Sequence, residues 1–106
     1  MLYFDWDPLK AEENRNKHGI SFGAASAALE DPFALEEFDR IVDGELRLCT
    51  IGMAAGEVVV LVTHVNEDLN DGMDELARII SARKASPGER RCYEQLRSQG
   101  GGYATE

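Results

Sequence analysis

The chain has 106 residues, enough for one domain with a single hydrophobic core. Hydrophobic residues make up 43% of it and charged residues 29%, a balance far from that of disordered chains. No apolar run approaches the ~20 residues of a membrane-spanning helix, and the N-terminus is acidic and aromatic rather than basic and apolar. We therefore expect a cytoplasmic protein with no membrane partner.

Charge is unevenly distributed along this acidic chain, whose formal net charge is -9. Residues 30–75 hold thirteen acids and two bases, whereas residues 78–97 hold six of the eleven Lys and Arg residues. The net charge argues against non-specific nucleic-acid binding by the whole surface. The segregation predicts one acidic face and one locally basic face.

The cysteines and histidines are too few and too scattered to predict a metal site. Cys49 and Cys92 lack the close spacing of metal ligands, and the chain has two histidines. We interpret both cysteines as buried, reduced thiols, with a disulfide as the alternative. The sequence also lacks a Gly-rich phosphate loop. We expect no metal and no nucleotide cofactor.

The first third of the chain predicts a strand and two helices. Apolar residues alternate with polar ones over 2–6, which predicts a short strand. Asp7 is suited to cap a helix over 8–18, which begins with a proline and is followed by a glycine suited to a left-handed cap. Ser21 precedes an alanine-rich stretch that predicts a second helix over 22–30.

The rest of the chain predicts a sheet and a last helix. An acidic, turn-rich stretch over 66–75 predicts a long exposed hairpin loop. Ser86 and Glu89 have the spacing of a capping box at the start of the helix. Connections of hairpin length make the strands antiparallel, with the helices packed on one face. The expected strands cover 34–41, 46–53, 58–65 and 76–83, and the helix covers 87–98.

Together these elements predict an α+β fold. The expected order is β-α-α, then a four-stranded antiparallel sheet, then a C-terminal helix. A single domain is expected over residues 1–98. The Gly-rich residues 99–106 are expected to form a flexible tail.

Polar residues dominate the first predicted helix, which is typical of a solvated cover or of a working surface. Lys10, Asn14, Lys17 and His18 share one face of it, because residues three and four apart are neighbours on a helix. A solvated face is the simpler interpretation. The alternative is functional, since a cation, an amide and an imidazole side by side can hold a phosphodiester and move a proton near neutral pH.

A basic dipeptide, Arg83 and Lys84, ends the last predicted strand. Alternation places Arg83 in an inward row, and Arg78 on the opposite side of the strand. An inward guanidinium either pairs with an acid or grips phosphate oxygens. The start of the last helix, which carries Arg90, adds an anion site through its free N–H groups. His64 stands among valines, where a hydrogen-bonded core histidine is the simpler interpretation.

Several of these stretches, in order along the chain, resemble one known family. Residues 4–22 read F-D-W-D-P-x-K-x-x-x-N-x-x-K-H-G-I-S-F, and residues 31–33 read D-P-F. Residues 44–52 read G-E-x-R-x-x-x-I-G, and residues 78–94 read R-I-I-S-A-R-K-A-x-x-x-E-R-x-x-Y-E. The pattern is similar to that of the BrnT family of type II toxins over nearly the whole chain.

The resemblance implies a RelE-like fold and a metal-independent endoribonuclease toxin that cuts RNA and halts translation. The chemistry it implies is attack of the ribose 2′-OH on the adjacent phosphate, helped by a general base, a general acid and cations. The partner it implies is a BrnA-like antitoxin that covers the site. That antitoxin carries a ribbon-helix-helix domain, so operator DNA is contacted only through it. A basic antitoxin segment is expected, because most of the toxin surface is acidic.

The resemblance also carries roles onto single residues. It implies catalytic roles for Arg83, Lys84 and His18. In place of the T-E-R-like segment of the family, this chain has Thr63 and His64 followed by acidic residues, so His64 becomes a candidate substitute for the missing arginine. Two further hypotheses are a catalytically inactive, antitoxin-binding corepressor and a scaffold domain without nucleic acid. The candidate substrate-binding residues are Lys10, Asn14, Lys17, Arg47 and Arg90.

Overall fold

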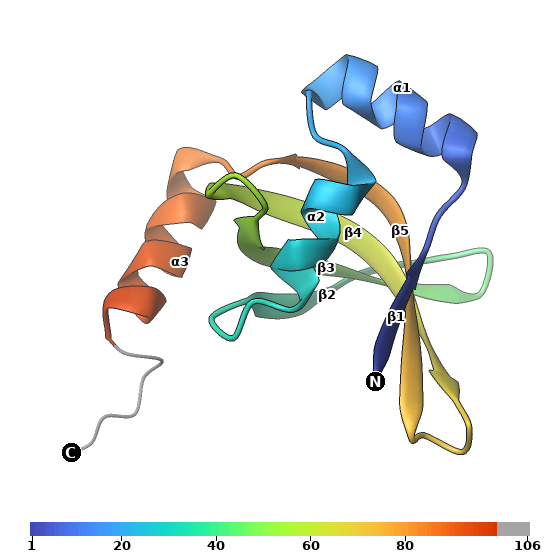
Figure 1. Ribbon diagram of the computed structural model, residues 1–106. Coiled ribbons are helices and arrows are strands. Elements are labelled where there is room, and N and C mark those ends of the chain that lie inside the picture. The colour runs from blue at the N-terminus through green and yellow to red at the C-terminus, as the bar shows by residue number, and fades with distance from the viewer. Residues whose placement is uncertain (100–106) are drawn as a thin grey trace.

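The computed structural model describes residues 1–99 and shows a five-stranded sheet with three helices around it (Figure 1). In chain order the elements are β1 (Leu2–Asp5), α1 (Pro8–His18), α2 (Phe22–Leu29), β2 (Leu35–Val42), β3 (Glu45–Ala54), β4 (Val58–Leu69), β5 (Asp74–Lys84) and α3 (Pro87–Ser98). No helix within the described residues is long and apolar enough to cross a membrane. The predicted tail lies, from residue 100 on, outside the described residues.

The helices begin where local side chains satisfy the free backbone groups, as the sequence predicts. The Asp7 carboxylate accepts from the Leu9 N–H at 2.9 Å, and Gly19 ends α1 with φ at 73°. At the start of α3, Ser86 and Glu89 form the predicted capping box. These helix starts are confirmed because each cap involves residues only two or three positions apart.

The sheet differs from the prediction in strand number. Its order is β1-β5-β4-β3-β2, and β1 pairs in parallel with β5 while the other neighbours are antiparallel. The four predicted antiparallel strands are confirmed as β2–β5, and so is the α+β class, but the prediction did not place β1 in the sheet as a fifth, parallel strand. A parallel partner some seventy residues away along the chain leaves no turn signal in the sequence.

The predicted long loop over 66–75 is mostly strand. The β4–β5 ladder continues as far as Leu69 opposite Asp74, so only residues 70–73 form the turn. Asn70 and Asp71 occupy the left-handed region, with φ of 53° and 57°. The prediction was wrong because acidic side chains at exposed positions do not prevent backbone pairing, while Asn and Asp tolerate the turn conformation.

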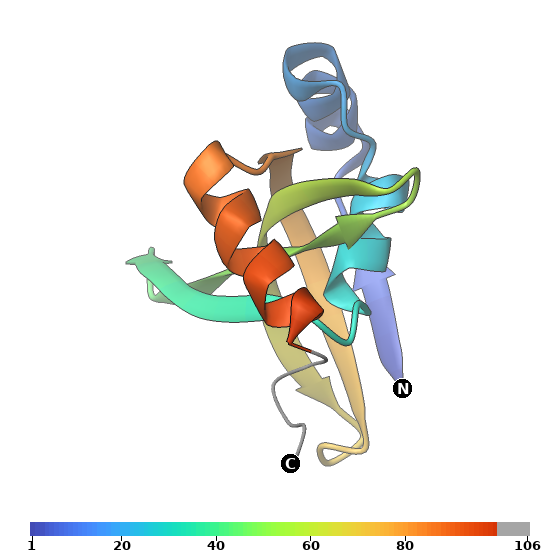
Figure 2. The ribbon, with the colours of Figure 1, turned by 90° about the vertical axis from the view of Figure 1, so that its left-hand side faces the viewer.

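The helices cover both faces of the sheet, not one face as predicted. Val60 and Val62 of β4 belong to a core with Phe22 and other residues of α2, while Val59 packs in a second core with Tyr93 of α3. Figure 2 shows α2 and α3 separated by the strands. The two cores follow from the alternation of a strand that is apolar on both sides.

Close contact between α2 and β3 depends on Gly52. A Cβ added to Gly52 would lie 2.5 Å from the Ala28 carbonyl oxygen of α2. The contact continues at the end of β3, where the Ala55 N–H donates to the Ala24 carbonyl at 3.1 Å. α2 therefore lies directly on the backbone at this end of β3.

Asp31 ties α3 to the sheet. Its carboxylate accepts from the buried Tyr93 hydroxyl, from the Met53 N–H at 2.8 Å and from the Phe33 N–H at 2.9 Å. Burial acts to raise the pKa of Asp31, but these hydrogen bonds outweigh it, so the pKa is lowered. Burial and the bond to Asp31 raise the pKa of Tyr93 to about 12. Tyr93 thus stays protonated and holds the middle of α3 in place.

Candidate functional site

A cleft of about 450 Å³ opens on the α3 side of the sheet, and we call it the Arg83 cleft. Its walls come from β2, β3, β4, β5 and the start of α3. Charged and hydroxyl side chains dominate the lining, which holds two arginines, three acids and two hydroxyls: Arg40, Arg83, Glu37, Asp39, Glu89, Thr63 and Ser81. The cleft is therefore suited to a polar ligand.

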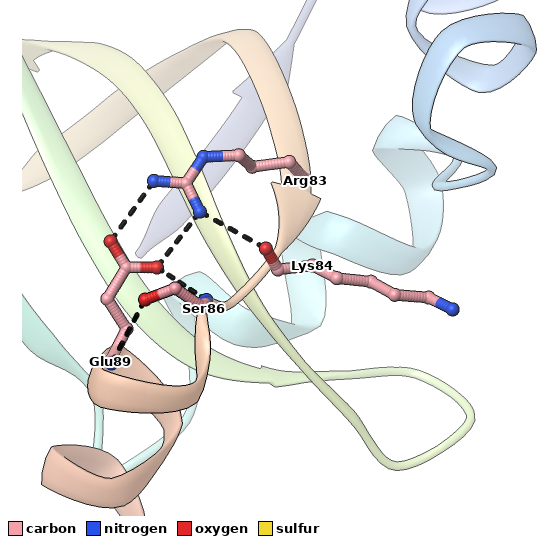
Figure 3. Close-up of polar contacts among 4 residues, drawn as sticks. All are labelled: Arg83, Lys84, Ser86 and Glu89. Atoms are coloured by element: carbon pink, nitrogen blue, oxygen red, sulfur yellow. Dashed lines mark hydrogen bonds and ion pairs between the residues drawn. The ribbon is translucent and has the colours of Figure 1, made fainter.

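Arg83 reaches across this cleft to the start of α3 (Figure 3). Its Nη1 and Nη2 donate to the two carboxylate oxygens of Glu89 at 2.9 and 3.1 Å, and Nη1 also donates to the Lys84 carbonyl. These bonds lower the pKa of Glu89 to about 2, against the opposing effect of burial. Of the two predicted roles for Arg83, the pairing with an acid is the one present in the free chain.

The same bonds change the titration of Arg83. The hydrogen bonds to Glu89 raise its pKa further, so it stays a cation. The Arg83 side chain is 43% exposed, which leaves the guanidinium accessible from the cleft. A ligand phosphate that binds this fork has to compete with a carboxylate.

Lys84 does not join Arg83. It points to the other side of β5 (Figure 3), as strand alternation requires. In the ladder it lies opposite Val60, whose side chain belongs to the α2 core, whereas Arg83 lies opposite Leu61. The two basic residues are neighbours in sequence and separated by the sheet in space.

Arg78 lies on the same face as Arg83, contrary to the alternation prediction. Arg78 lies opposite Val65, and Arg83 lies opposite Leu61. Val65 and Leu61 are four residues apart on β4, so their side chains point to the same face of the sheet. The register shift between Thr63 and His64 leaves an extra residue on β5, and this bulge reverses the facing of everything beyond it. The sequence analysis missed Arg78 as a site residue because alternation counts along a single strand.

Glu45 connects Arg78 with Arg47, which the sequence analysis proposed as a substrate-binding residue. Arg78 Nη2 donates to Glu45 at 2.5 Å, and Arg47 Nη2 lies 3.9 Å from the same carboxylate. The buried Nε of Arg47 has no hydrogen-bond partner among the described residues. Arg40 lies opposite Arg47 and pairs with Asp39 at 3.2 Å. Each of the four arginines that the strands present on this face thus has a carboxylate within 4.0 Å.

The basic face of α1 lines a second cleft, of about 260 Å³, at the edge of β5. Its lining comprises two lysines, a histidine, an acid and an amide of α1 and two residues of β5: Lys10, Lys17, His18, Glu13, Asn14, Ile80 and Ser81. Ser81 also lines the Arg83 cleft, so the two clefts adjoin at that residue. The structure thus brings the cations of α1 next to the cleft that holds Arg83.

Asn14, which the sequence analysis grouped with these cations, is buried and serves the fold. Its Oδ1 accepts from the Ala82 N–H at 3.1 Å, and its Nδ2 donates to the Ala82 and Ile20 carbonyls at 2.8 and 3.1 Å. β1 pairs only with β5 residues 75–78, so Asn14 takes the place of a strand partner further along. Its amide is not free to contact a substrate.

His64 is buried on the α2 side of the sheet, away from the Arg83 cleft. Its Nδ1 lies 2.6 Å from Asn66 Oδ1, and its Nε2 lies 2.7 Å from the Thr50 hydroxyl. An amide oxygen can only accept, which places a proton on Nδ1, and the Thr50 hydroxyl can pair with Nε2 as donor or as acceptor. Both ring nitrogens are therefore satisfied, as in the core-histidine interpretation. The structure does not place His64 where it could replace an arginine of the cleft.

Of the remaining residues, Arg90 lies outside the two clefts, and the two cysteines are more exposed than predicted. Arg90 is exposed on α3, with its Nε 4.0 Å from Glu94. Both cysteines are free, but Cys92 is exposed and Cys49 is half-buried, so the prediction that both are buried was wrong. Burial, together with the nearby acids Asp39 and Glu37, raises the pKa of Cys49. Within residues 1–99 no three His, Cys, Asp or Glu side chains gather in a metal-binding arrangement.

This is a small α+β domain that presents arginines in a cleft, with two lysines and a histidine on the helix along the sheet edge, and such side chains can contact phosphate groups. The family model of the ribonuclease toxin BrnT, of type II toxin-antitoxin systems, matches residues 6–89. The chain therefore belongs to this family, which confirms the resemblance seen in its motifs.

The solved structures that resemble this chain include that of the ribonuclease toxin BrnT of Brucella abortus, determined at 1.1 Å resolution. Its crystal structure aligns with a TM-score of 0.57 and 29% sequence identity, over 81% of this chain and 99% of that one. No curated protein matches the chain.

Proposed function

We propose that the chain is an endoribonuclease toxin that cleaves RNA, without a metal, and so inhibits translation. The observation that carries this proposal is the junction of the two clefts at Ser81. A phosphodiester bound there has Arg83 on the sheet side and Lys17 and His18 on the α1 side. These side chains supply the positive charge and the proton-transfer group that cleavage by a ribose 2′-OH needs.

The roles follow from the chemistry of each side chain. The planar fork of Arg83 is suited to two oxygens of the charged phosphorane, so Arg83 stabilises the transition state. An imidazole is the side chain best suited to proton transfer near neutral pH, so His18 acts on the 2′-OH or on the leaving oxygen. Lys10 and Lys17 hold flanking phosphates. Arg47 and Arg78 lie further along the same face and share the Glu45 carboxylate, and they bind further phosphates when RNA displaces it.

A second candidate function is supported by the pairing of the arginines. Each of the four strand arginines on the α3 side of the sheet has a carboxylate partner, so RNA must displace Glu89 and its counterparts before it binds them. This cost favours a toxin relative that binds its antitoxin as a corepressor and does not cleave RNA.

In both cases we propose a cytoplasmic complex with a BrnA-like antitoxin. The antitoxin covers the Arg83 cleft and contacts operator DNA through a ribbon-helix-helix domain. Support comes from the family, whose members are toxins of type II toxin-antitoxin systems.

The test is RNA cleavage by the purified chain in the presence of a chelator. We expect products with 2′,3′-cyclic phosphate and 5′-hydroxyl ends, and no cleavage where the nucleotide before the cut is 2′-deoxy. Arg83→Ala is expected to lower the rate by about 10²-fold. Arg91→Ala is the matched control, because Arg91 is exposed on α3 and lines neither cleft.

Two results overturn the enzyme assignment. The first is a wild-type chain that cuts no RNA and does not slow growth when induced, yet binds its antitoxin; this outcome supports the corepressor. The second is cleavage that Arg83→Ala and Arg91→Ala affect equally, which removes the Arg83 cleft from the reaction.

A further inference from the structure

Three large apolar side chains lie exposed together on the β2–β3 hairpin. Phe38 is 61% exposed, Ile41 64% and Leu46 49%. Ile41 lies opposite Leu46 in the ladder, and Phe38 lies opposite Leu48. Because opposite residues of a ladder share a face, these four form one surface, which we call the hairpin patch.

A bulge makes the patch continuous. Phe38 and Ile41 are three residues apart, so in a regular strand they would face opposite sides. The register shift between Phe38 and Arg40 adds one residue to β2 and turns Ile41 to the same side as Phe38. Since Leu48 lies opposite the buried His64 of β4, this is the α2 side of the sheet.

Within residues 1–99, no helix covers the hairpin patch. α2 contacts the other end of β3, at Gly52 and Ala55, while the patch lies near the β2–β3 turn. Figure 1 shows the tip of this hairpin projecting away from α2. β2 is also the last strand of the sheet, so its outer backbone groups are free to pair with a partner.

An acidic pocket of about 320 Å³ adjoins the patch. Its lining includes Glu36, two residues before Phe38, and Glu75. Asp68 lies opposite Glu75 in the ladder. Within residues 1–99 none of these three carboxylates makes an ion pair. The pocket therefore presents unpaired negative charge beside exposed apolar surface.

A chain of hydrogen bonds holds the floor of this pocket. The Thr50 hydroxyl bonds to His64, His64 bonds to Asn66, and Asn66 Nδ2 donates to Glu75 at 2.6 Å. Thr50 and His64 are buried, so the Glu75 carboxylate is fixed from below. A fixed carboxylate loses little conformational freedom when a cation binds it.

We infer that the hairpin patch and the acidic pocket form a docking surface for a segment of the antitoxin that carries both apolar and basic side chains. The apolar side chains cover Phe38, Ile41 and Leu46, and a Lys or Arg side chain enters the pocket between Glu36 and Glu75. The charge of the surface selects a basic partner, and the apolar patch supplies the area that burial needs. The inference rests on the proposed function, because it takes the antitoxin as the partner.

This docking surface lies on the opposite face of the sheet from the Arg83 cleft. The antitoxin segment that docks here therefore contacts different side chains from the part of the antitoxin that covers the cleft. Substitutions in the patch are expected to weaken antitoxin binding without changing RNA cleavage by the free toxin.

The experiment measures the affinity of the purified chain for its purified cognate antitoxin by calorimetry. Phe38→Ser and Ile41→Ser are each expected to weaken binding at least about tenfold. Glu36→Gln is expected to weaken it and to reduce its salt dependence. Met73→Ser is the control, because Met73 is also a large exposed apolar side chain, 80% exposed, and lies at the β4–β5 turn away from the patch. All four positions lie outside the two clefts.

Each outcome decides the inference. Unchanged affinity of the patch variants, with a wild type that binds, overturns it. A change in self-association of the chain alone, measured by light scattering, also overturns it, because the patch is then an interface between copies. A wild type that binds through the patch but cleaves no RNA upholds the inference and refutes only the enzyme assignment. A wild type that does not bind the antitoxin refutes the inference, and the enzyme assignment is then decided by the RNA cleavage assay.

Discussion

Glu89 holds both terminal nitrogens of Arg83, at 2.9 and 3.1 Å, while the same carboxylate accepts from the Ser86 N–H at 2.8 Å. One side chain therefore caps α3 and occupies the arginine fork in the cleft. The stability of the helix start and the availability of Arg83 to a phosphate are linked through this carboxylate.

The first prediction concerns acid stability. The folded-state pKa of Glu89 is about 2, below the ordinary value of 4.5, so ionisation of Glu89 stabilises the fold. The stabilisation is fully present above pH 4.5 and is lost as the pH falls from 4.5 to about 2. Urea unfolding at a series of pH values should show the wild type losing its advantage over Glu89→Gln in that window. The Gln variant is a suitable reference, because Gln also completes a capping box.

The second prediction concerns RNA binding by the same variant. Glu89→Gln removes the charge that competes with a phosphate for Arg83, so we expect KM for RNA to fall about three- to tenfold, or about 1 kcal/mol of binding. Steady-state cleavage kinetics measure this. An unchanged KM with a lower kcat would contradict the prediction and make Glu89 a residue that positions Arg83.

The third prediction separates Asn14 from the cations around it. Asn14→Ala leaves the Ala82 N–H and two buried carbonyls without partners, so we expect the free energy of unfolding to fall by about 2–4 kcal/mol. Asn16→Ala, an exposed change on the same helix, is the control. Equal free energies of unfolding for the two variants in chemical denaturation would show that the hydrogen bonds between Asn14 and Ala82 of β5 do not stabilise the fold.

The fourth prediction concerns the contact between Tyr93 and Asp31. Tyr93→Phe removes a buried hydroxyl and leaves the Asp31 carboxylate with two backbone donors, which we expect to cost about 1–3 kcal/mol of stability. Tyr3→Phe is the matched control, since Tyr3 is exposed on β1. The lowered pKa of Asp31 also predicts how this stability depends on pH. The contribution of the ionised Asp31 carboxylate is present above pH 3.8 and is lost at lower pH.

The fifth prediction tests the packing of α2 on β3. Gly52→Ala places a methyl group against the Ala28 carbonyl, and we expect a loss of about 1–3 kcal/mol or more. Gly23→Ala, on the helix itself, meets nothing within 4 Å and is expected to leave stability equal or higher. We expect thermal unfolding to show a lower melting temperature for Gly52→Ala and an equal or higher one for Gly23→Ala. Melting temperatures lowered alike in both variants would contradict the prediction.

Much of the fold and part of the candidate site could be predicted from the sequence. The caps at Asp7, Ser21 and Ser86 were predicted, because a cap involves a side chain and a backbone group two or three residues away. The shared face of Lys10, Lys17 and His18 follows from the same local geometry. The family was also evident from the motifs, which the match over residues 6–89 confirms.

The sequence by itself thus determined the helices, the strand-rich middle and the family, since these depend on neighbours along the chain. Only the tertiary structure decided which side chains share a face of the sheet. The bulges at Ile80 and near Asp39 put Arg78 with Arg83 and Phe38 with Ile41, and the distant partner strand decides where such a bulge falls. The pairing of Arg83 with Glu89 likewise required β5 and α3 to meet at the cleft, so it became visible only in the folded chain.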